Sequence, residues 1–147
     1  MAKKIIKQGW IYNNKEVIET PEEYEGFIYV ITNLTNGKFY IGRKSFYSYS
    51  KRKLTIAEKK LPENKRKTFT VTKKETPWRG YTGSCKELNE DIKNGHVVKK
   101  EIIRLCRMRK QMTAWETKEI LCSGCLERED CYNNNVLGKI FSKDFKD

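Results

Sequence analysis

Residues 26–42 read GFIYVITNLTNGKFYIG, and this stretch decides the fold. Residues 27–31 are β-branched or aromatic throughout, which is typical of a β-strand. Residues 33–37 end in an Asn-Gly pair of the kind that closes β-hairpins. Residues 38–41 then return as a second strand, and Gly42 ends it. The stretch therefore predicts two antiparallel strands joined by a short loop.

The downstream sequence predicts two helices and one more strand. Ser/Thr-x-x-Glu capping boxes begin at Ser84 and at Thr113, and each predicts the start of a helix. The Asn-Gly pair at residues 94–95 ends the first of these helices. Residues 96–106 are rich in apolar residues and favour a strand between the two helices.

These elements predict an α+β fold with a small, mainly antiparallel three-stranded sheet flanked by helices. Before them, residues 10–12 and 16–18 flank a turn-like segment and predict a short N-terminal hairpin. The expected organisation is an N-terminal arm (1–25), a main domain (26–138) that contains a basic helix or loop insertion (43–76), and a loose C-terminal tail (139–147).

The formal net charge of +12 is concentrated in one part of the chain. Residues 43–74 hold twelve Lys or Arg and two acids, so this stretch carries +10 and the rest of the chain +2. A polyanion such as nucleic acid is the natural partner for so local an excess, and the segment is expected to become ordered on it. The alternative is a solvated, flexible basic loop.

The five cysteines are expected to be reduced thiols, because their number is odd and the chain does not start with an apolar secretory stretch. Cys122 and Cys125 have the spacing of a zinc half-site, with Cys131 and His96 as the only obvious further ligands. We interpret them as ordinary thiols, and a thiol or zinc protein remains a third functional alternative. The sequence has no apolar run of membrane-spanning length, and a cytoplasmic location is expected.

Two tyrosines of the predicted hairpin can serve phosphodiester chemistry. Tyr29 and Tyr40 are eleven positions apart, so they cannot share a face of one strand, but across a hairpin they can lie on one face. A phenol has a reference pKa of about 10 and is a poor base as it stands. Nearby cations and a metal-bound water lower that barrier. The cations close in sequence are Lys38, Arg43, Lys44 and Arg52.

Residues 26–29, followed by residues 40–42, resemble the signature of the GIY-YIG nuclease superfamily, and residues 25–138 resemble its small phage-encoded members. The resemblance implies an endonuclease that hydrolyses DNA phosphodiester bonds with Mg²⁺ or Mn²⁺ through a tyrosine-activated water. The first triplet is Phe-Ile-Tyr rather than Gly-Ile-Tyr, with Gly26 displaced by one position. The departure is mild, because the tyrosine is the functional member.

The resemblance also implies roles for individual residues. Tyr29 resembles the general base, and Tyr40 resembles the partner that orients the water or the phosphate. Arg52 lies nearest the expected position of the arginine that holds the scissile phosphate, and Arg43 is the second choice. Glu116 resembles the glutamate that binds the metal ion.

Two of the remaining assignments have alternatives. Glu119 is the nearest rival of Glu116 as metal ligand, and Glu116 could instead merely complete a capping box. Asn133 resembles the asparagine that supports the site from a late loop, with Asn135 as the alternative. A plain polar turn would also explain either asparagine.

DNA is the expected partner, and no membrane partner is expected. Sequence preference has to come from this domain or from a homodimer. A nucleic-acid-binding module without hydrolysis is the alternative to the enzyme. The residues expected to contact DNA are Lys38, Lys44, Lys51, Lys53, Arg66, Lys67 and Arg79.

Overall fold

The structure is a computed structural model of the chain, and it describes residues 9–147. Their contacts divide into two compact units. The first contains the described residues up to Phe46 together with Pro77–Asp147, and the second is Tyr47–Thr76. Residues 1–8 of the predicted N-terminal arm lie outside the described part of the chain.

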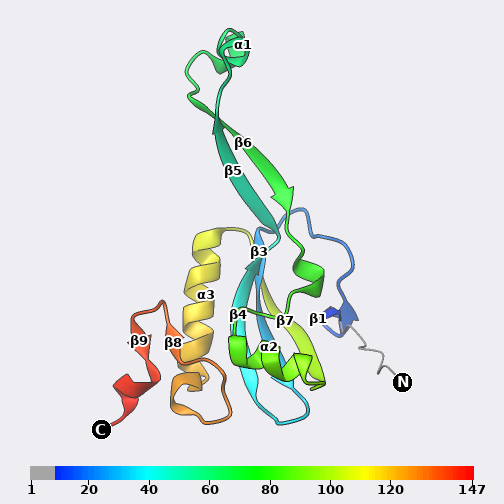
Figure 1. Cartoon of the computed structure of the whole chain (residues 1–147), viewed down its shortest axis with the longest axis vertical. Helices are drawn as coiled ribbons and strands as arrows, with labels where there is room; N and C mark the ends of the chain where they lie inside the picture. The colour runs from blue at the N-terminus through cyan, green and yellow to red at the C-terminus, as the bar shows by residue number, and fades with distance from the viewer. Residues whose placement is uncertain (1–8) are drawn as a thin grey trace. The chain divides into compact units, whose positions relative to one another are not determined.

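The first unit is built on a five-stranded sheet with the strand order β2-β1-β7-β3-β4 (Figure 1). Its strands are β1 (Trp10–Tyr12), β2 (Lys15–Glu16), β3 (Gly26–Asn33), β4 (Phe39–Ser45) and β7 (Val98–Cys106). β1 pairs with β7 in parallel, and the other neighbours are antiparallel. The α+β prediction is confirmed. The three-stranded sheet was too small, because the N-terminal hairpin joins the sheet beside β7 and is not a separate arm.

Both predicted hairpins are present, and the residues of their turns explain why. Gly37 takes a φ of 78° between β3 and β4. Asn13 and Asn14 take φ values of 50° and 65° between β1 and β2. Asparagine and glycine tolerate this left-handed region better than other residues, so these turns were readable from sequence.

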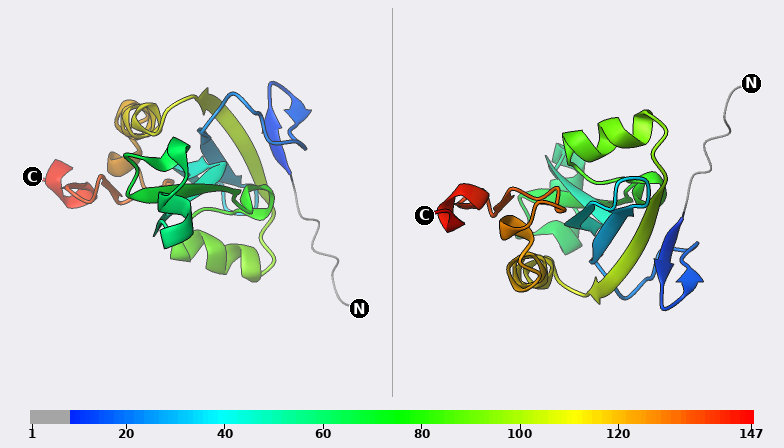
Figure 2. Two further views of the ribbon diagram at one scale, coloured as in Figure 1. Left: turned by 90° about the horizontal axis from the view of Figure 1, so that it is seen from above. Right: turned by 90° about the horizontal axis from the view of Figure 1, so that it is seen from below.

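Two helices, α2 (Lys86–Lys93) and α3 (Arg109–Cys122), lie on opposite faces of the sheet (Figure 2). Neither helix starts at its predicted capping box. Cys85 is the N-cap of α2 and Met108 that of α3, and neither side chain makes a capping hydrogen bond. Thr113 lies inside α3, so the glutamate three residues after it has no capping role.

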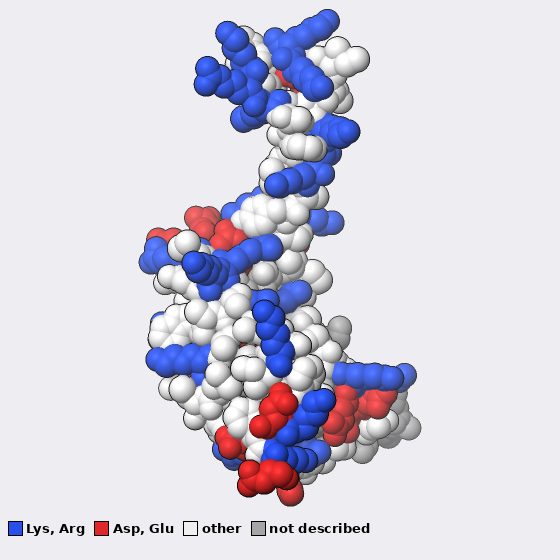
Figure 3. All heavy atoms as spheres, turned by 90° about the vertical axis from the view of Figure 1, so that its left-hand side faces the viewer, with Lys and Arg blue, Asp and Glu red and all other residues white. Residues whose placement is uncertain are grey.

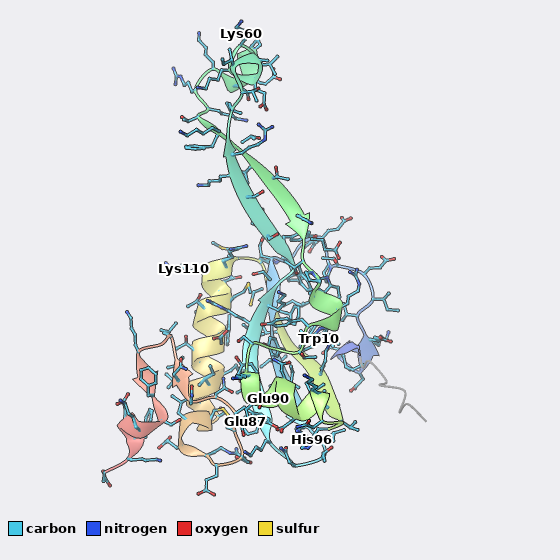
Figure 4. The ribbon with its side chains drawn as sticks, viewed as in Figure 1. Trp10, Lys60, Glu87, Glu90, His96 and Lys110 are labelled. Carbon is cyan, nitrogen blue, oxygen red and sulfur yellow. A yellow bond between two sulfur atoms is a disulfide. The ribbon has the colours of Figure 1, made fainter. Side chains whose placement is uncertain are left out.

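The sheet has a different core on each face. On the α3 side, Ile28 and Ile41 pack with Met112 and Ile120 of the helix. Side chains alternate along a strand, so the neighbours of Ile28 point to the other face. An aromatic cluster fills that face, with neighbouring ring centroids 5.0–6.1 Å apart. Its members are Trp10 (labelled in Figure 4), Phe27, Tyr29, Phe46 and Trp78.

Short elements complete the first unit. They are η2 (Trp78–Gly80), η3 (Cys125–Glu127), β8 (Asn135–Val136), β9 (Ile140–Phe141) and η4 (Ser142–Phe145). β8 and β9 pair in antiparallel fashion. The segment 139–147, expected to be a loose tail, therefore contains a paired strand and a turn of 3-10 helix. No helix within residues 9–147 is long and apolar enough to cross a membrane.

The cysteines differ in part from the prediction. Cys125 and Cys131 form a disulfide with their Cα atoms 5.5 Å apart, so the expectation of reduced thiols is wrong for this pair. Cys85, Cys106 and Cys122 are free thiols. The zinc alternative lacks ligands in the described chain, because residues 9–147 hold no cluster of three His, Cys, Asp or Glu side chains.

The second unit is an antiparallel hairpin of β5 (Tyr47–Lys53) and β6 (Phe69–Glu75). Its connecting segment contains α1 (Ile56–Lys59) and η1 (Pro62–Asn64). This corrects the predicted basic helix or loop at 43–76 in two respects. Two paired strands of seven residues each form the insertion together with the short helices, and the first residues of the predicted segment belong instead to β4, which continues to Ser45.

Candidate active site

Tyr29 of β3 and Tyr40 of β4 lie on the same face of the central hairpin. Tyr29 is opposite Gly42, and Tyr40 is opposite Ile31, so the two tyrosines are diagonal neighbours across the strand pair. Their ring centroids are 6.2 Å apart. The hairpin therefore places the two phenols together, as the spacing in the sequence predicted.

Two glycines make room for the phenols. A Cβ atom on Gly42 would collide with the hydroxyl of Tyr29, so only glycine fits opposite this ring. Gly83 has a φ of 84°, and a Cβ there would lie 3.3 Å from the Tyr29 hydroxyl and 3.2 Å from the ring of Tyr40. The loop before α2 thus passes close to both side chains.

The same loop supplies two polar groups that the sequence analysis did not assign. Tyr81 makes an edge contact with Tyr29, with ring centroids 6.1 Å apart, and a side-chain hydrogen bond joins the two residues. The hydroxyls of Ser84 and Tyr40 are 3.2 Å apart. Lys44 places its Nζ 4.3 Å from the centre of the Tyr81 ring. The glycine and serine of this loop are visible in the sequence, but they do not identify a contact with a distant hairpin.

Glu116 reaches the site from helix α3. Its Oε2 is 3.5 Å from Nε of Arg43 on β4, and Arg43 also donates a hydrogen bond to the hydroxyl of Thr113. β4 is the last strand in the sheet order, so side chains from both faces can converge at its edge. The charge of Glu116 raises the pKa of both Tyr29 and Tyr40, so the carboxylate lies within electrostatic reach of both phenols.

The titration behaviour of these groups is set mainly by burial. Burial raises the pKa of Tyr29 far above the ordinary phenol value, and Tyr81, Tyr40 and Glu116 add to the rise. Burial also raises the pKa of Tyr40, while the hydrogen bond from Ser84 lowers it. The pKa of Glu116 is raised by burial and lowered by Arg43. The positive charge of Arg43 thus offsets only part of the effect of burial on Glu116.

Asn133 ties the edge strand to the chain that follows α3. Its Oδ1 accepts from the backbone N–H of Ile41 at 2.9 Å, and its Nδ2 donates to the Ile41 carbonyl at 2.8 Å. Asn135 instead accepts from the backbone N–H of Gly138 in a surface turn. Asn133 is therefore the asparagine that touches the hairpin of the two tyrosines.

The other predicted residues are divided between the two units. Arg43 and Lys44 are at the tyrosine pair, whereas Arg52 is in the second unit, where its guanidinium binds both carboxylate oxygens of Glu58 at 2.7 and 3.0 Å. Lys38 pairs with Glu87 of α2, which Figure 4 labels, at 3.3 Å.

The remaining expected DNA contacts follow the same division. Nε of Arg79 donates to the carbonyl of Ile18 at 2.7 Å within the first unit. Four further lysines and arginines belong to the second unit and are exposed: Lys51, Lys53, Arg66 and Lys67.

The residues of the site fit a hard divalent cation better than a metal that needs several protein ligands. Glu116 is one carboxylate with a side chain 22% exposed, so solvent can reach it while burial disfavours its charge. Mg²⁺ keeps most of its water and needs only one or two carboxylates. A cation at Glu116 would offset the cost of burying that charge.

Comparison with known proteins finds a family for most of the chain. A family model described as "Putative endonuclease segE, GIY-YIG domain" matches residues 10–136. No curated protein and no solved structure matches the chain. The matched range contains the five-stranded sheet, helix α3 and all the side chains gathered around Tyr29 and Tyr40.

Proposed function

Because the chain belongs to the GIY-YIG endonuclease family over residues 10–136, we propose that it hydrolyses DNA phosphodiester bonds with a divalent metal ion held by Glu116. One observation carries the proposal. The charge of Glu116 on α3 acts on both Tyr29 and Tyr40 of the hairpin. A carboxylate for a metal ion thus lies within electrostatic reach of two phenols for proton transfer.

Each side chain has a chemical task in this proposal. Bound Mg²⁺ or Mn²⁺ supplies positive charge beside the phenols and the scissile phosphate. With Tyr29 ionised, its Oη would accept a proton from the water whose oxygen attacks phosphorus. The bond from phosphorus to the leaving sugar oxygen breaks, and that oxygen takes a proton from solvent water. Oη of Tyr40, held by Ser84, orients the water or the phosphate. The raised pKa of Tyr29 makes its base role dependent on added positive charge.

Arg43 is the arginine that we propose for the scissile phosphate. It already contacts Glu116 at the edge of β4, whereas the guanidinium of Arg52 is held by Glu58 within the hairpin. We expect Arg43→Gln to lower kcat on saturating plasmid DNA by about 10²-fold or more. Arg52→Gln should leave kcat unchanged. The opposite pattern would restore Arg52 as the first choice.

Glu116→Gln tests the proposal most directly. The change keeps the size of the side chain but removes the charge that would hold the metal ion. We expect metal-dependent nicking of plasmid DNA to be lost, while duplex binding measured in EDTA persists. Glu119→Gln, on the same helix, is the matched control and should cleave like the native protein. Equal activity of the Glu116 variant and the native protein would contradict the proposal.

Burial of Tyr29 favours a second candidate, a nucleic-acid-binding module without hydrolysis. Its phenol is 1% exposed, and its pKa is raised, so the unaided side chain is a poor base. The same plasmid experiment separates the two candidates. Binding without cleavage at any concentration of Mg²⁺ or Mn²⁺ would support the binding module.

A further inference from the structure

The hairpin at 47–76 is a second surface suited to a polyanion. It contains ten Lys or Arg and three acids, a net charge of +7. All ten basic residues are exposed. Figure 3 shows Lys and Arg side chains crowded over this hairpin, and Figure 4 labels Lys60 in its connecting segment. Such a density of exposed charge is costly to keep unless an anion neutralises it.

The strand register distributes this charge over both faces of the hairpin. Cross-strand partners share a face, and successive pairs alternate between faces. Lys51, Lys53 and Lys73 lie on one face with Tyr49, Phe69 and Val71. Arg52 and Lys74 lie on the other face with Ser48, Ser50, Thr70 and Thr72. The connecting segment adds Lys59, Lys60, Lys65, Arg66 and Lys67.

Glu58, one of the three acids of the hairpin, makes its contacts within the hairpin itself. Glu58 completes a capping box with Thr55 at the start of α1 and binds Arg52 through both oxygens. Nδ2 of Asn64 donates to the Glu58 carbonyl at 2.8 Å. These contacts order the connecting segment, so its five cations are presented on a folded support.

Cations on both faces restrict the shape of the partner. A flat anionic surface meets one face of a two-stranded ribbon and leaves the other in water. The major groove of duplex DNA has phosphates on both sides and is about 12 Å wide, enough for a two-stranded ribbon whose strands are about 4.8 Å apart. The face that carries Ser48, Ser50, Thr70 and Thr72 can form hydrogen bonds with base edges. The other face carries Phe69 and Val71, which are 48% and 53% exposed and can contact thymine methyl groups.

We propose that the hairpin 47–76 enters the major groove of duplex DNA and binds phosphates on both sides of it. The inference rests on the proposed function in taking duplex DNA as the substrate. It goes further in assigning DNA capture to the hairpin, while cleavage belongs to the residues around Glu116. Binding and cleavage then depend on different residues and can be lost separately.

Charge-removal variants of the full chain test this proposal. One variant carries K51Q, K53Q and K73Q, another K65Q, R66Q and K67Q, and the control K86Q, K93Q and K139Q. The affinity for a fluorescent 30-base-pair duplex is measured in EDTA at several KCl concentrations. Each lost phosphate contact should lower the slope of log Kd against log[KCl] by about 0.9. The slope of each hairpin variant, which removes three positive charges, should therefore be lower by about two to three than that of the native protein. The affinity should fall by about tenfold or more, and the control should bind nearly as the native protein does.

The groove is tested by competition. Methyl green, which occupies the major groove, should weaken binding, and netropsin, which occupies the minor groove, should not. Hairpin variants with the native affinity and salt slope would overturn the proposal, as would competition by netropsin alone or tighter binding of the single strand than of the duplex. EDTA removes cleavage from the readout. A failure of the hairpin proposal is thus distinct from the inactivity on plasmid DNA that would contradict the nuclease.

Discussion

Gly42 is the residue on which the geometry of the two tyrosines depends most directly. It lies opposite Tyr29 in the strand register, and any Cβ atom at this position would collide with the Tyr29 hydroxyl. Glycine is therefore required at the end of the Tyr-Ile-Gly triplet because it has no side chain, and not because its backbone is flexible. It leaves the space into which the phenol extends toward the edge of β4.

Gly42→Ala should displace the Tyr29 hydroxyl and impair cleavage. We expect kcat to fall by about 10²-fold, because misplacing a reacting group by about 1 Å can cost that much. DNA binding measured in EDTA should be unchanged. Gly80→Ala is the matched control, since a Cβ atom there meets nothing within 4 Å. A Gly42→Ala enzyme with native kcat would show that the position of Tyr29 does not limit the reaction.

At the scale of elements, β4 is completed by a side chain in place of a further strand. The amide of Asn133 both accepts from and donates to the backbone of Ile41, as a neighbouring peptide group would. The sulfurs of Cys125 and Cys131 lie 3.3 and 3.4 Å from its Oδ1. The segment after α3 thereby fixes the edge of the sheet at which the candidate site lies.

Asn133→Ala should destabilise the chain and weaken cleavage. The substitution leaves the N–H and carbonyl of Ile41 without these partners, at a cost of about 1–3 kcal/mol. For a chain of this length, each kcal/mol lowers Tm by about 2–4 °C. The exposed Asn134 provides the control, and Asn134→Ala should change the unfolding free energy by less than about 0.5 kcal/mol. Equal Tm values for the two variants in a thermal melt would contradict this role.

Local patterns predicted some of these elements and misplaced others. The hairpin of β3 and β4 was predictable because its strand residues and its Asn-Gly turn act over short distances. The predicted start of α2 was one residue early, since Cys85 and not Ser84 is its N-cap. The predicted start of α3 was wrong, because a Thr three residues before a Glu occurs inside helices as well as at their ends. The strands of the hairpin 47–76 were missed because their alternation of apolar and polar residues lasts only four residues in each strand, at 47–50 and 69–72, and then gives way to charged residues.

At the scale of the whole molecule, the assembly of the five-stranded sheet and of the candidate site depends on contacts between segments that are distant in the sequence. The parallel pairing of β1 with β7 and the approach of Tyr81 to Tyr29 join residues that no local pattern connects. Glu116 could be proposed because the family resemblance fixed its register on the last long helix. No role was predicted for Tyr81 or Ser84, so this half of the candidate site is known only from the structure.

Above neutral pH, the free energy of unfolding should depend on pH in part through Lys100. This side chain is 2% exposed, donates to the Arg79 carbonyl at 3.0 Å, and has its pKa lowered to about 8 by burial. An unfolded lysine has a pKa of about 10.4. Between these two values the unfolded chain binds more protons than the folded chain, so the contribution of Lys100 to stability increases with pH over this window.

Lys100→Met should abolish that contribution. We expect the stability of the native protein, measured by urea unfolding at pH 7.5, 8.5 and 9.5, to increase relative to that of the variant as the pH rises. Loss of the hydrogen bond to Arg79 should lower the free energy of unfolding of the variant by a similar amount at every pH. A difference between the two proteins that changes with pH therefore reports the pKa of Lys100. Parallel curves for the two proteins would mean that Lys100 keeps its ordinary pKa in the folded state.

Tyr47 and Glu75 face each other where the inserted hairpin begins and ends. The chain therefore departs and returns across a gap of about 5 Å, the spacing of two neighbouring strands, which a tight turn can close. An insertion with such close ends can be lengthened, trimmed or exchanged without rerouting the chain that builds the five-stranded sheet. Under the proposal that this hairpin captures DNA, its exchange would alter the affinity for DNA and leave the residues around Tyr29 and Tyr40 in place.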